Sequence, residues 1–217
     1  MRKGDLPATA PGRDHVHKAL LEKVLKAELP PGARLVEAQI AALLGVSRTP
    51  VREALLRMER EGFVVGEPNR GFSVSALDER AAREIFPIVG ALQGLAVVET
   101  GPILASIVSP LRRANEQMRA SATPVEAMAA DSDFHGLLVS LCPNARLIAL
   151  IETLHKQLLR YEHVYMSDAS LIETSFAQHC DIVDGIERGN FAAAERAVRA
   201  NYASGLAIVI SKLRETI

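Results

Sequence analysis

The sequence of 217 residues contains no tryptophan, and aromatic residues make up only 4% of it. Alanine and leucine are abundant instead, and both favour helices over strands. Only two cysteines are present, Cys142 and Cys180, and they form no CxxC pair. Both fall in helical patterns, so we expect reduced thiols in a cytosol rather than a disulfide framework.

A signal peptide and a membrane span are not expected either. The first residues, "MRKGDLPATAPGRD", lack the apolar core of a signal peptide, and we expect residues 1–12 to form a flexible tail. The stretch from Ile85 to Leu111 carries a single charge, but glycines and prolines interrupt it repeatedly (Pro87, Gly90, Gly94, Gly101, Pro102 and Pro110). We therefore interpret it as two buried helices of a bundle.

The formal net charge of −1 gives no hint of an anionic partner for the chain as a whole. The two parts of the chain differ, however. Residues 1–77 hold 12 Lys and Arg against 9 Asp and Glu, and the remainder holds 13 against 17. A basic N-terminal segment on an acidic body weakly indicates nucleic-acid binding.

Residues 13–75 show the element order of a winged helix-turn-helix. Apolar spacing predicts helices over residues 13–28, 37–44 and 49–61, with "LPPGARL" ending the first and "GVS" forming a tight turn before the third. The run "EGFVVGEPNRGFSVSAL" then predicts a two-stranded hairpin with a glycine-containing loop.

Polar groups gather at the start of the third predicted helix. Arg48, Thr49 and Arg52 lie away from its apolar face, Ser47 can cap it, and Pro50 suits its first turn. Guanidinium groups and backbone N–H groups at a positive helix end can bind phosphates and read guanine edges in the major groove.

At the hairpin tip, Asn69, Arg70 and Gly71 could reach the adjacent minor groove. The lone histidines His15 and His17 are expected on the surface.

The segment "LPPGARLVEAQIAALLGVSRTPVREALLRMEREGFVV…NRGFSV" closely resembles the DNA-binding domain of the GntR superfamily. This resemblance implies a bacterial transcription factor that binds a palindromic operator as a homodimer. It assigns DNA contacts to Ser47, Arg48, Thr49 and Arg52, with Gly71 in the wing.

Residues 76–217 predict an all-helical domain. Six helical segments can be drawn, at about 78–98, 102–120, 124–141, 145–166, 170–188 and 191–214. Short separators between them carry turn and cap chemistry, including Asn144 and Asn190 as N-caps. The predicted fold class is therefore mainly α, with a winged helix-turn-helix followed by a six-helix antiparallel bundle.

Four polar residues interrupt the apolar stripes of this predicted bundle. Asp131 and His135 are four residues apart on one helical face, His179 shares a face with apolar residues, and so does Asn201. Each alone is more often a satisfied buried polar group than a ligand, but four converging groups need a shared partner. A divalent ion, or a cavity with water and a polar ligand, would supply it.

The segments "DSDFHGLLVSLCPNARL" and "QHCDIVDGIERGNFAAAERAVRANYASGL" resemble the FadR-type C-terminal ligand domain, called FCD, in its VanR-like six-helix branch. The resemblance implies dimerisation, a small-molecule effector, and a metal such as Zn²⁺, Ni²⁺ or Mn²⁺ held by Asp131, His135 and His179. Asn201 stands where metal-binding members carry a third histidine. Gly90 and Gln93 stand in a stretch where the family often has an arginine and a glutamate.

We therefore expect a transcriptional regulator, most simply a repressor, that an organic acid or related metabolite releases from its operator. His155, Tyr161, His163 and Tyr165 could line the effector pocket, or form an ordinary helix face. Two alternatives stay open: a metal-dependent hydrolase using the Asp/His site, and a DNA-binding regulator whose pocket has degenerated. No nucleophile constellation or glycine-rich cofactor loop favours the enzyme.

Overall fold

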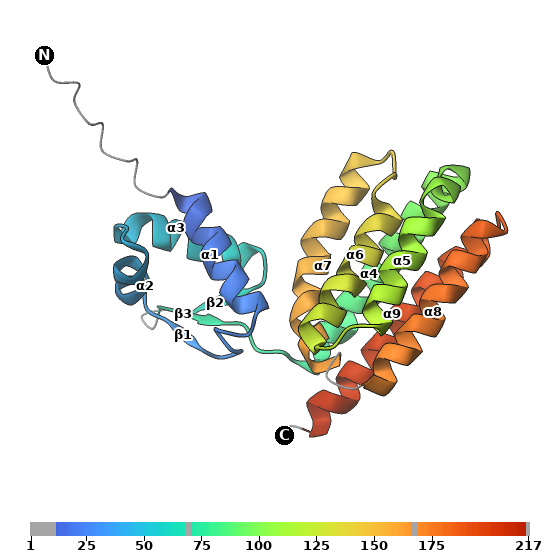
Figure 1. The fold of residues 1–217 in the computed structure, drawn as a ribbon. Helices are drawn as coiled ribbons and strands as arrows, with labels where there is room; N and C mark the ends of the chain where they lie inside the picture. Colours follow the sequence, from blue (N-terminus) through green and yellow to red (C-terminus); the bar gives the residue numbers. More distant parts are fainter. Residues whose placement is uncertain (1–11, 68–70, 166–168, 216–217) are drawn as a thin grey trace, which may run out of the picture. The chain divides into compact units, whose positions relative to one another are not determined.

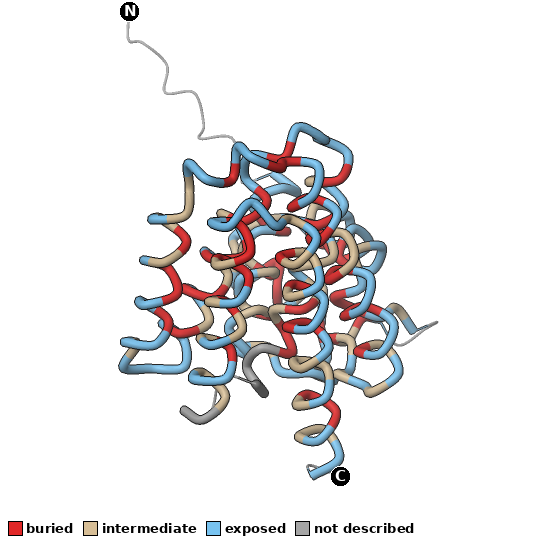
Figure 2. Tube along the Cα trace, turned by 90° about the vertical axis from the view of Figure 1, so that its right-hand side faces the viewer, coloured by how far each residue is buried: buried red, intermediate tan, exposed pale blue. Residues whose placement is uncertain are grey.

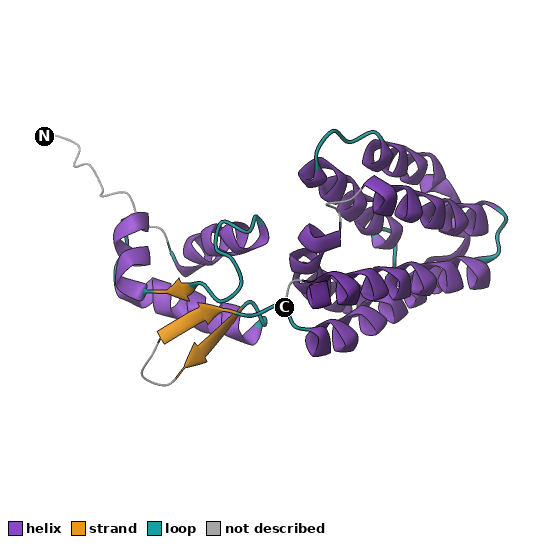
Figure 3. Ribbon diagram, turned by 90° about the horizontal axis from the view of Figure 1, so that it is seen from below, coloured by secondary structure: helices purple, strands orange, loops and turns teal. Residues whose placement is uncertain are grey.

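The computed structural model describes residues 12–67, 71–165 and 169–215, and the chain divides into two compact units, Met1–Ala76 and Leu77–Ile217. Figure 3 shows that the strands belong to the first unit and that the second is built of helices. The mainly α fold predicted from the sequence is confirmed. Each unit has a hydrophobic core of its own.

The first unit is a winged helix-turn-helix. Its elements are α1 (Arg13–Leu25), β1 (Arg34–Leu35), α2 (Glu37–Leu44), α3 (Arg48–Arg60), β2 (Val64–Glu67) and β3 (Gly71–Val74). The strands form an antiparallel sheet in the order β1-β3-β2, with Gly66 opposite Phe72. The apolar face of α3, formed by Val51, Ala54, Leu55 and Met58, is buried as its spacing predicts.

Three predictions for this unit were wrong in detail. The sheet has a third strand, β1, because Arg34 and Leu35 pair with β3. Helix α1 ends at Leu25 rather than near residue 28, since Ala27 adopts a left-handed conformation (φ 55°) that stops the helix before the prolines. His17 is buried and lies 2.6 Å from a carboxylate oxygen of Glu61.

The second unit is the predicted bundle. Its helices are α4 (Glu79–Thr100), α5 (Val108–Arg119), α6 (Pro124–Val139), α7 (Ala145–Tyr165), α8 (Ala169–Glu187) and α9 (Phe191–Glu215). The second predicted helix begins differently from the prediction: a 3₁₀ segment, η1 (Gly101–Ile107), precedes α5. Figure 2 shows buried residues as stripes along the helices, with exposed positions between them.

Side chains at the helix ends fix where the bundle helices begin. Asp78 accepts a hydrogen bond from the N–H of Ala81 at 2.8 Å, and Thr123 forms a capping box with Glu126. The predicted N-caps are confirmed: Asn144 accepts from Leu147 N–H at 3.1 Å, and Asn190 accepts from Ala193 N–H at 3.0 Å. These caps set the register at which the helices present their inner faces.

By length and composition alone, the stretch Glu79–Arg119 would be long and apolar enough to cross a membrane. It is not one helix, because α4 ends at Thr100 and a 3₁₀ segment follows. Half of its most apolar window is buried inside the protein. This is the behaviour of core helices, as the sequence interpretation expected.

Candidate functional site: a histidine and carboxylate cluster in the bundle and an arginine-bearing helix in the winged unit

Asp131, His135 and His179 come together inside the bundle. Asp131 and His135 lie one turn apart on α6, and His179 reaches them from α8. One potential ligand atom from each residue lies within 4.8 Å of the others. Nε2 of His179 is 3.6 Å from Asp131 Oδ1, and Nε2 of His135 is 3.9 Å from Asp131 Oδ2. These distances exceed a direct hydrogen bond and leave space for a shared ion between the three groups.

Amide side chains from two further helices contact the outer nitrogens of the imidazoles. Nδ1 of His135 is 2.9 Å from Oε1 of Gln93 on α4, and Nδ1 of His179 is 3.1 Å from Oδ1 of Asn115 on α5. Phe134 stacks on the His179 ring at a centroid distance of 3.9 Å and an angle of 4°. The imidazole planes are therefore held from outside the cluster.

Nε2 of His179 is buried and has no hydrogen-bond partner among the described residues. An orphaned buried nitrogen is rare in proteins and calls for an explanation such as a water or an ion. Its lone pair faces the Asp131 carboxylate, which has no cationic partner in the cluster if both imidazoles are neutral. A divalent cation fits this donor set and would satisfy both groups at once.

Burial shifts the protonation of the cluster towards neutral forms. It raises the pKa of the Asp131 carboxyl to about 7 and lowers the pKa of His179 to about 3. Burial first, and then the nearby His179 and His155, hold the pKa of His135 well below its ordinary value. Both imidazoles are thus in the neutral form that binds metals, and a bound cation would stabilise the ionised carboxylate.

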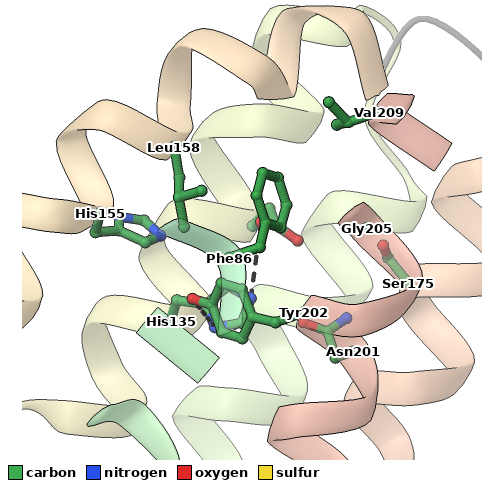
Figure 4. Close-up of a pocket in the computed structure, with 10 residues that line it drawn as sticks. Phe86, His135, His155, Leu158, Ser175, Asn201, Tyr202, Gly205 and Val209 are labelled. Atoms are coloured by element: carbon green, nitrogen blue, oxygen red, sulfur yellow. Dashed lines mark hydrogen bonds and ion pairs between the residues drawn. The ribbon is translucent and has the colours of Figure 1, made fainter. Parts of the chain in front are cut away.

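Two residues of the cluster, Asp131 and His135, line a cavity of about 40 Å³. Asn201 on α9 also lines this cavity; its amide nitrogen donates to Oε1 of Gln178 at 3.0 Å, which leaves the carbonyl oxygen available to a ligand. Figure 4 shows His135, Tyr202 and Asn201 together, with Phe86 and Leu158 forming an apolar part of the wall. A cavity of this volume has room for an ion with a few waters, or for a small polar ligand.

Tyr202 occupies the space next to Gly90. A Cβ atom added to Gly90 would lie 3.0 Å from Tyr202 Cβ, so the tyrosine packs directly on the glycine backbone. The hydroxyl of Tyr202 lies 3.4 Å from His135 Nδ1. An aromatic side chain from α9 therefore fills the space beside residue 90.

In the winged unit, Ser47, Arg48, Thr49 and Arg52 are all exposed around the start of α3, and Pro50 is half-buried in the first turn. Ser47 occupies the N-cap position, but its side chain makes no capping hydrogen bond, so that part of the prediction was wrong. Within the described part of the chain, Arg52 has one long ion pair, 3.8 Å to Glu37, and its side chain is 67% exposed. The hydroxyl and the guanidinium groups are therefore available to an external partner.

In the wing, Gly71 begins β3 with a φ of 84°, a left-handed conformation that favours glycine. The predicted contacts Asn69 and Arg70 lie outside the described residues.

Two family models match the chain: the gntR family of bacterial regulatory proteins over residues 13–74, and the FCD domain over residues 84–204. The chain is a GntR-family regulator with an FCD domain. An HTH-type transcriptional regulator of Agrobacterium vitis, from the TAR-I ttuE–ttuC' intergenic region, is 34% identical over 63% of this chain and 84% of its own length. The HTH-type transcriptional repressor RspR of Escherichia coli is 25% identical over 89% of this chain and 86% of its own.

Solved structures agree with the fold of this GntR-family regulator. A GntR transcriptional regulator from a Rhodococcus species has a TM-score of 0.78 at 24% identity, covering 92% of this chain and 97% of its own. Escherichia coli McbR/YncC has a TM-score of 0.74 at 21% identity, covering 93% and 98%. The family and its relatives are DNA-binding transcriptional regulators and not enzymes, which excludes the hydrolase alternative.

Three of the four predicted polar residues of the bundle line one cavity in this regulator, namely Asp131, His135 and Asn201, and His179 lies against Asp131. Two neighbours were missed: Gln93 had been noted only as a departure from the family, and Asn115 not at all. Asn115 did carry a signal, because it lies on the buried stripe of α5 with Leu111 and Met118. Of the four residues of α7 that could line a pocket, His155 does so, whereas the side chains of residues 163 and 165 lie outside the described part.

Proposed function

We propose that this GntR-family regulator is a repressor that binds a palindromic operator as a homodimer. A small metabolite, of the organic-acid class or related to it, would control operator binding from the FCD cavity, which also holds a divalent metal. The observation that carries the proposal is the meeting of Asp131, His135 and the orphaned Nε2 of His179 inside the bundle, where Asp131 and His135 also line a cavity.

The exposed side chains at the start of α3 support the DNA-binding part. Arg48 and Arg52 suit guanine edges and phosphates, and the first backbone N–H groups of a helix attract anions. A dimer places two such helices about 34 Å apart, one turn of DNA. If one of the two helices moves away from this spacing, it no longer reaches its half of the operator, and half of the base contacts are lost.

An exposed apolar stripe supports the homodimer. Ile88, Leu95 and Val98 lie within one face of α4 and are 48%, 42% and 46% exposed. Exposed apolar patches on soluble proteins commonly mark interaction surfaces. We propose that a second copy of this chain covers the stripe.

Asp131, His135 and His179 would supply one oxygen and two nitrogen ligands to Zn²⁺, Ni²⁺ or Mn²⁺. Asn201 would add a neutral carbonyl oxygen, a weaker donor to such ions than the imidazole it replaces. The metal would fix the inner faces of α6, α8 and α9, and would offer a charge for an effector carboxylate. A cavity with an apolar wall and few polar groups suits a small effector.

A chain of contacts links the cavity to the domain boundary. Phe86 lines the cavity and meets the ring of Tyr161 edge-on, at a centroid distance of 6.0 Å. The hydroxyl of Tyr161 donates to the backbone carbonyl of Asp78 at 3.3 Å, and Asp78 is the second residue of the bundle unit. A ligand that moves Phe86 would thereby act on the segment that leads to the DNA-binding unit. Regulation requires a ligand that binds one conformation of the protein more tightly than another, and these contacts would supply that difference.

Elemental mass spectrometry tests the proposal. The protein is purified without a His-tag or chelators, beside His135→Ala and the control His15→Ala, which removes an exposed histidine. We expect about one metal per chain in the wild type and the control, and none in His135→Ala. If the wild type binds none even after incubation with Zn²⁺, Ni²⁺ or Mn²⁺, the metal part is wrong, and the cluster serves an organic ligand or a degenerate pocket.

A further inference from the structure

We infer that Gln93 and Asn115 are positioning residues that hold His135 and His179 with Nδ1 protonated, so that both Nε2 lone pairs face Asp131. This inference rests on the proposed function for its metal, but the protonation pattern can be observed without one. The argument begins with the orientation of one amide.

The amide of Asn115 can be oriented without ambiguity. Its nitrogen lies 3.0 Å from the backbone carbonyl of Phe176, an oxygen that can only accept a hydrogen bond. The amide oxygen must therefore be the atom that faces Nδ1 of His179 at 3.1 Å. Because an amide oxygen cannot donate, Nδ1 carries the proton and Nε2 carries the lone pair.

The opposite tautomer of His179 fits poorly. With the proton on Nε2, two lone pairs would face each other between Nδ1 and Asn115. The nearest carboxylate oxygen of Asp131, 3.6 Å from Nε2, lies beyond an ordinary hydrogen bond. The observed geometry thus satisfies the outer nitrogen and leaves the inner one for a ligand.

Gln93 faces His135 with its amide oxygen. Its Oε1 lies 2.9 Å from Nδ1, closer than the Tyr202 hydroxyl at 3.4 Å, so the amide is the principal partner. Gln93 is only 1% exposed, on the inner face of α4, where a polar side chain needs a reason to be buried. Two buried amides from separate helices, each on the outer nitrogen of one imidazole, match the outer partners that metal-binding histidines normally have.

The use of a neutral amide at residue 93, rather than a carboxylate, affects the charge of the site. Metal sites commonly use a carboxylate or a carbonyl oxygen in this outer position. A neutral amide orients the ring without adding a second negative charge beside Asp131. The site therefore keeps one formal negative charge, and a bound divalent ion keeps a net positive charge towards the cavity.

Nuclear magnetic resonance of the metal-free full-length protein, labelled with ¹⁵N at histidine, tests the tautomers directly. Two-bond proton–nitrogen correlations distinguish a protonated Nδ1 from a protonated Nε2, and His135→Ala and His179→Ala assign the signals. We expect a protonated Nδ1 and an unprotonated Nε2 on both rings. A protonated Nε2 on either ring overturns the assignment for that residue, whatever the protein does with metals.

Zn²⁺ affinity, measured by competition with a chelating dye, tests the consequence. Gln93→Leu and Asn115→Leu should each weaken Zn²⁺ binding by about 10–100-fold, whereas Gln93→Glu, which keeps an acceptor at the same place, should bind at least as tightly as the wild type. Gln117→Leu, an exposed amide on the same helix as Asn115, is the control and should change nothing.

Three results distinguish a failure of the inference about the two amides from a failure of the proposed metal site. If Gln93→Leu and Gln93→Glu weaken binding equally, glutamine serves only packing and the inference is overturned. If both leucine variants bind Zn²⁺ like the wild type, the amides do not set affinity and it is likewise overturned. If the wild type shows the expected tautomers but binds no metal, the tautomer assignment is supported while the metal in the proposed function is wrong.

Discussion

The substitution Asp131→Asn should stabilise the metal-free protein at pH 8 and leave it unchanged at pH 4. Asp131 is 6% exposed, and burial raises the pKa of its carboxyl from 3.8 to about 7. One pKa unit corresponds to about 1.4 kcal/mol, so ionising this group in the folded state costs about 4 kcal/mol. Asparagine keeps the shape and cannot ionise.

The sign follows from proton binding. Below pH 3.8 both the folded and the unfolded states hold the proton, and the carboxyl has no effect on stability. Between pH 4 and pH 7 only the unfolded state releases it, so the wild type loses free energy of unfolding progressively, and above pH 7 the loss is complete. The difference between the variant and the wild type should follow the same curve.

Urea unfolding in a chelator, followed by circular dichroism from pH 4 to pH 8, measures this difference. Because the winged unit is identical in both proteins, the change belongs to the bundle. Zn²⁺ should narrow the difference at pH 8, since only the wild type gains the binding energy of the metal: by about 2.7 kcal/mol at 100 times the Kd, and by about 4.1 kcal/mol, enough to cancel it, at 1,000 times the Kd. A difference in unfolding free energy that does not vary with pH would refute the reasoning about the buried carboxylate.

Three further outcomes are expected. Arg52→Ala should weaken specific operator binding by about 1–3 kcal/mol in fluorescence anisotropy without changing the fold, while Arg80→Ala, an exposed arginine of the bundle, should not. Gly185→Ala should destabilise the bundle by about 1–3 kcal/mol in thermal unfolding, because the added Cβ would lie 2.9 Å from the backbone of the next helix. Gly136→Ala, which has open space around it, should instead stabilise the bundle by up to about 1 kcal/mol. Leu95→Glu should shift the protein from dimer to monomer in light scattering, and a persistent dimer would move the interface away from α4.

The residues of the bundle site differ in how far the sequence alone predicts their positions. Asp131 and His135 were predictable as neighbours because a helix places residues four apart on one face. Their meeting with His179 depends on how α6 and α8 pack; the polar breaks in the apolar stripes indicated that these groups converge, and the family resemblance added that they could share a metal. Asn115 was within reach of the same reasoning, since it breaks the apolar stripe of α5.

Other features had no local signal at all. Strand β1 has only two residues, too few for an alternating pattern, and exists because β3 offers it a partner. The early end of α1 depends on Ala27, a residue that favours helices, adopting a left-handed conformation. In both places the tertiary structure overrides the local preference of the chain.

The packing of Tyr202 on Gly90 limits how this regulator can evolve. Any side chain introduced at residue 90 would press on the tyrosine, whose Cβ lies 3.0 Å from the position of the missing Cβ, so the tyrosine would have to shift. A large side chain at residue 90 is therefore best accommodated together with a smaller one at residue 202. Among descendants of this chain, we expect the two positions to change as a pair.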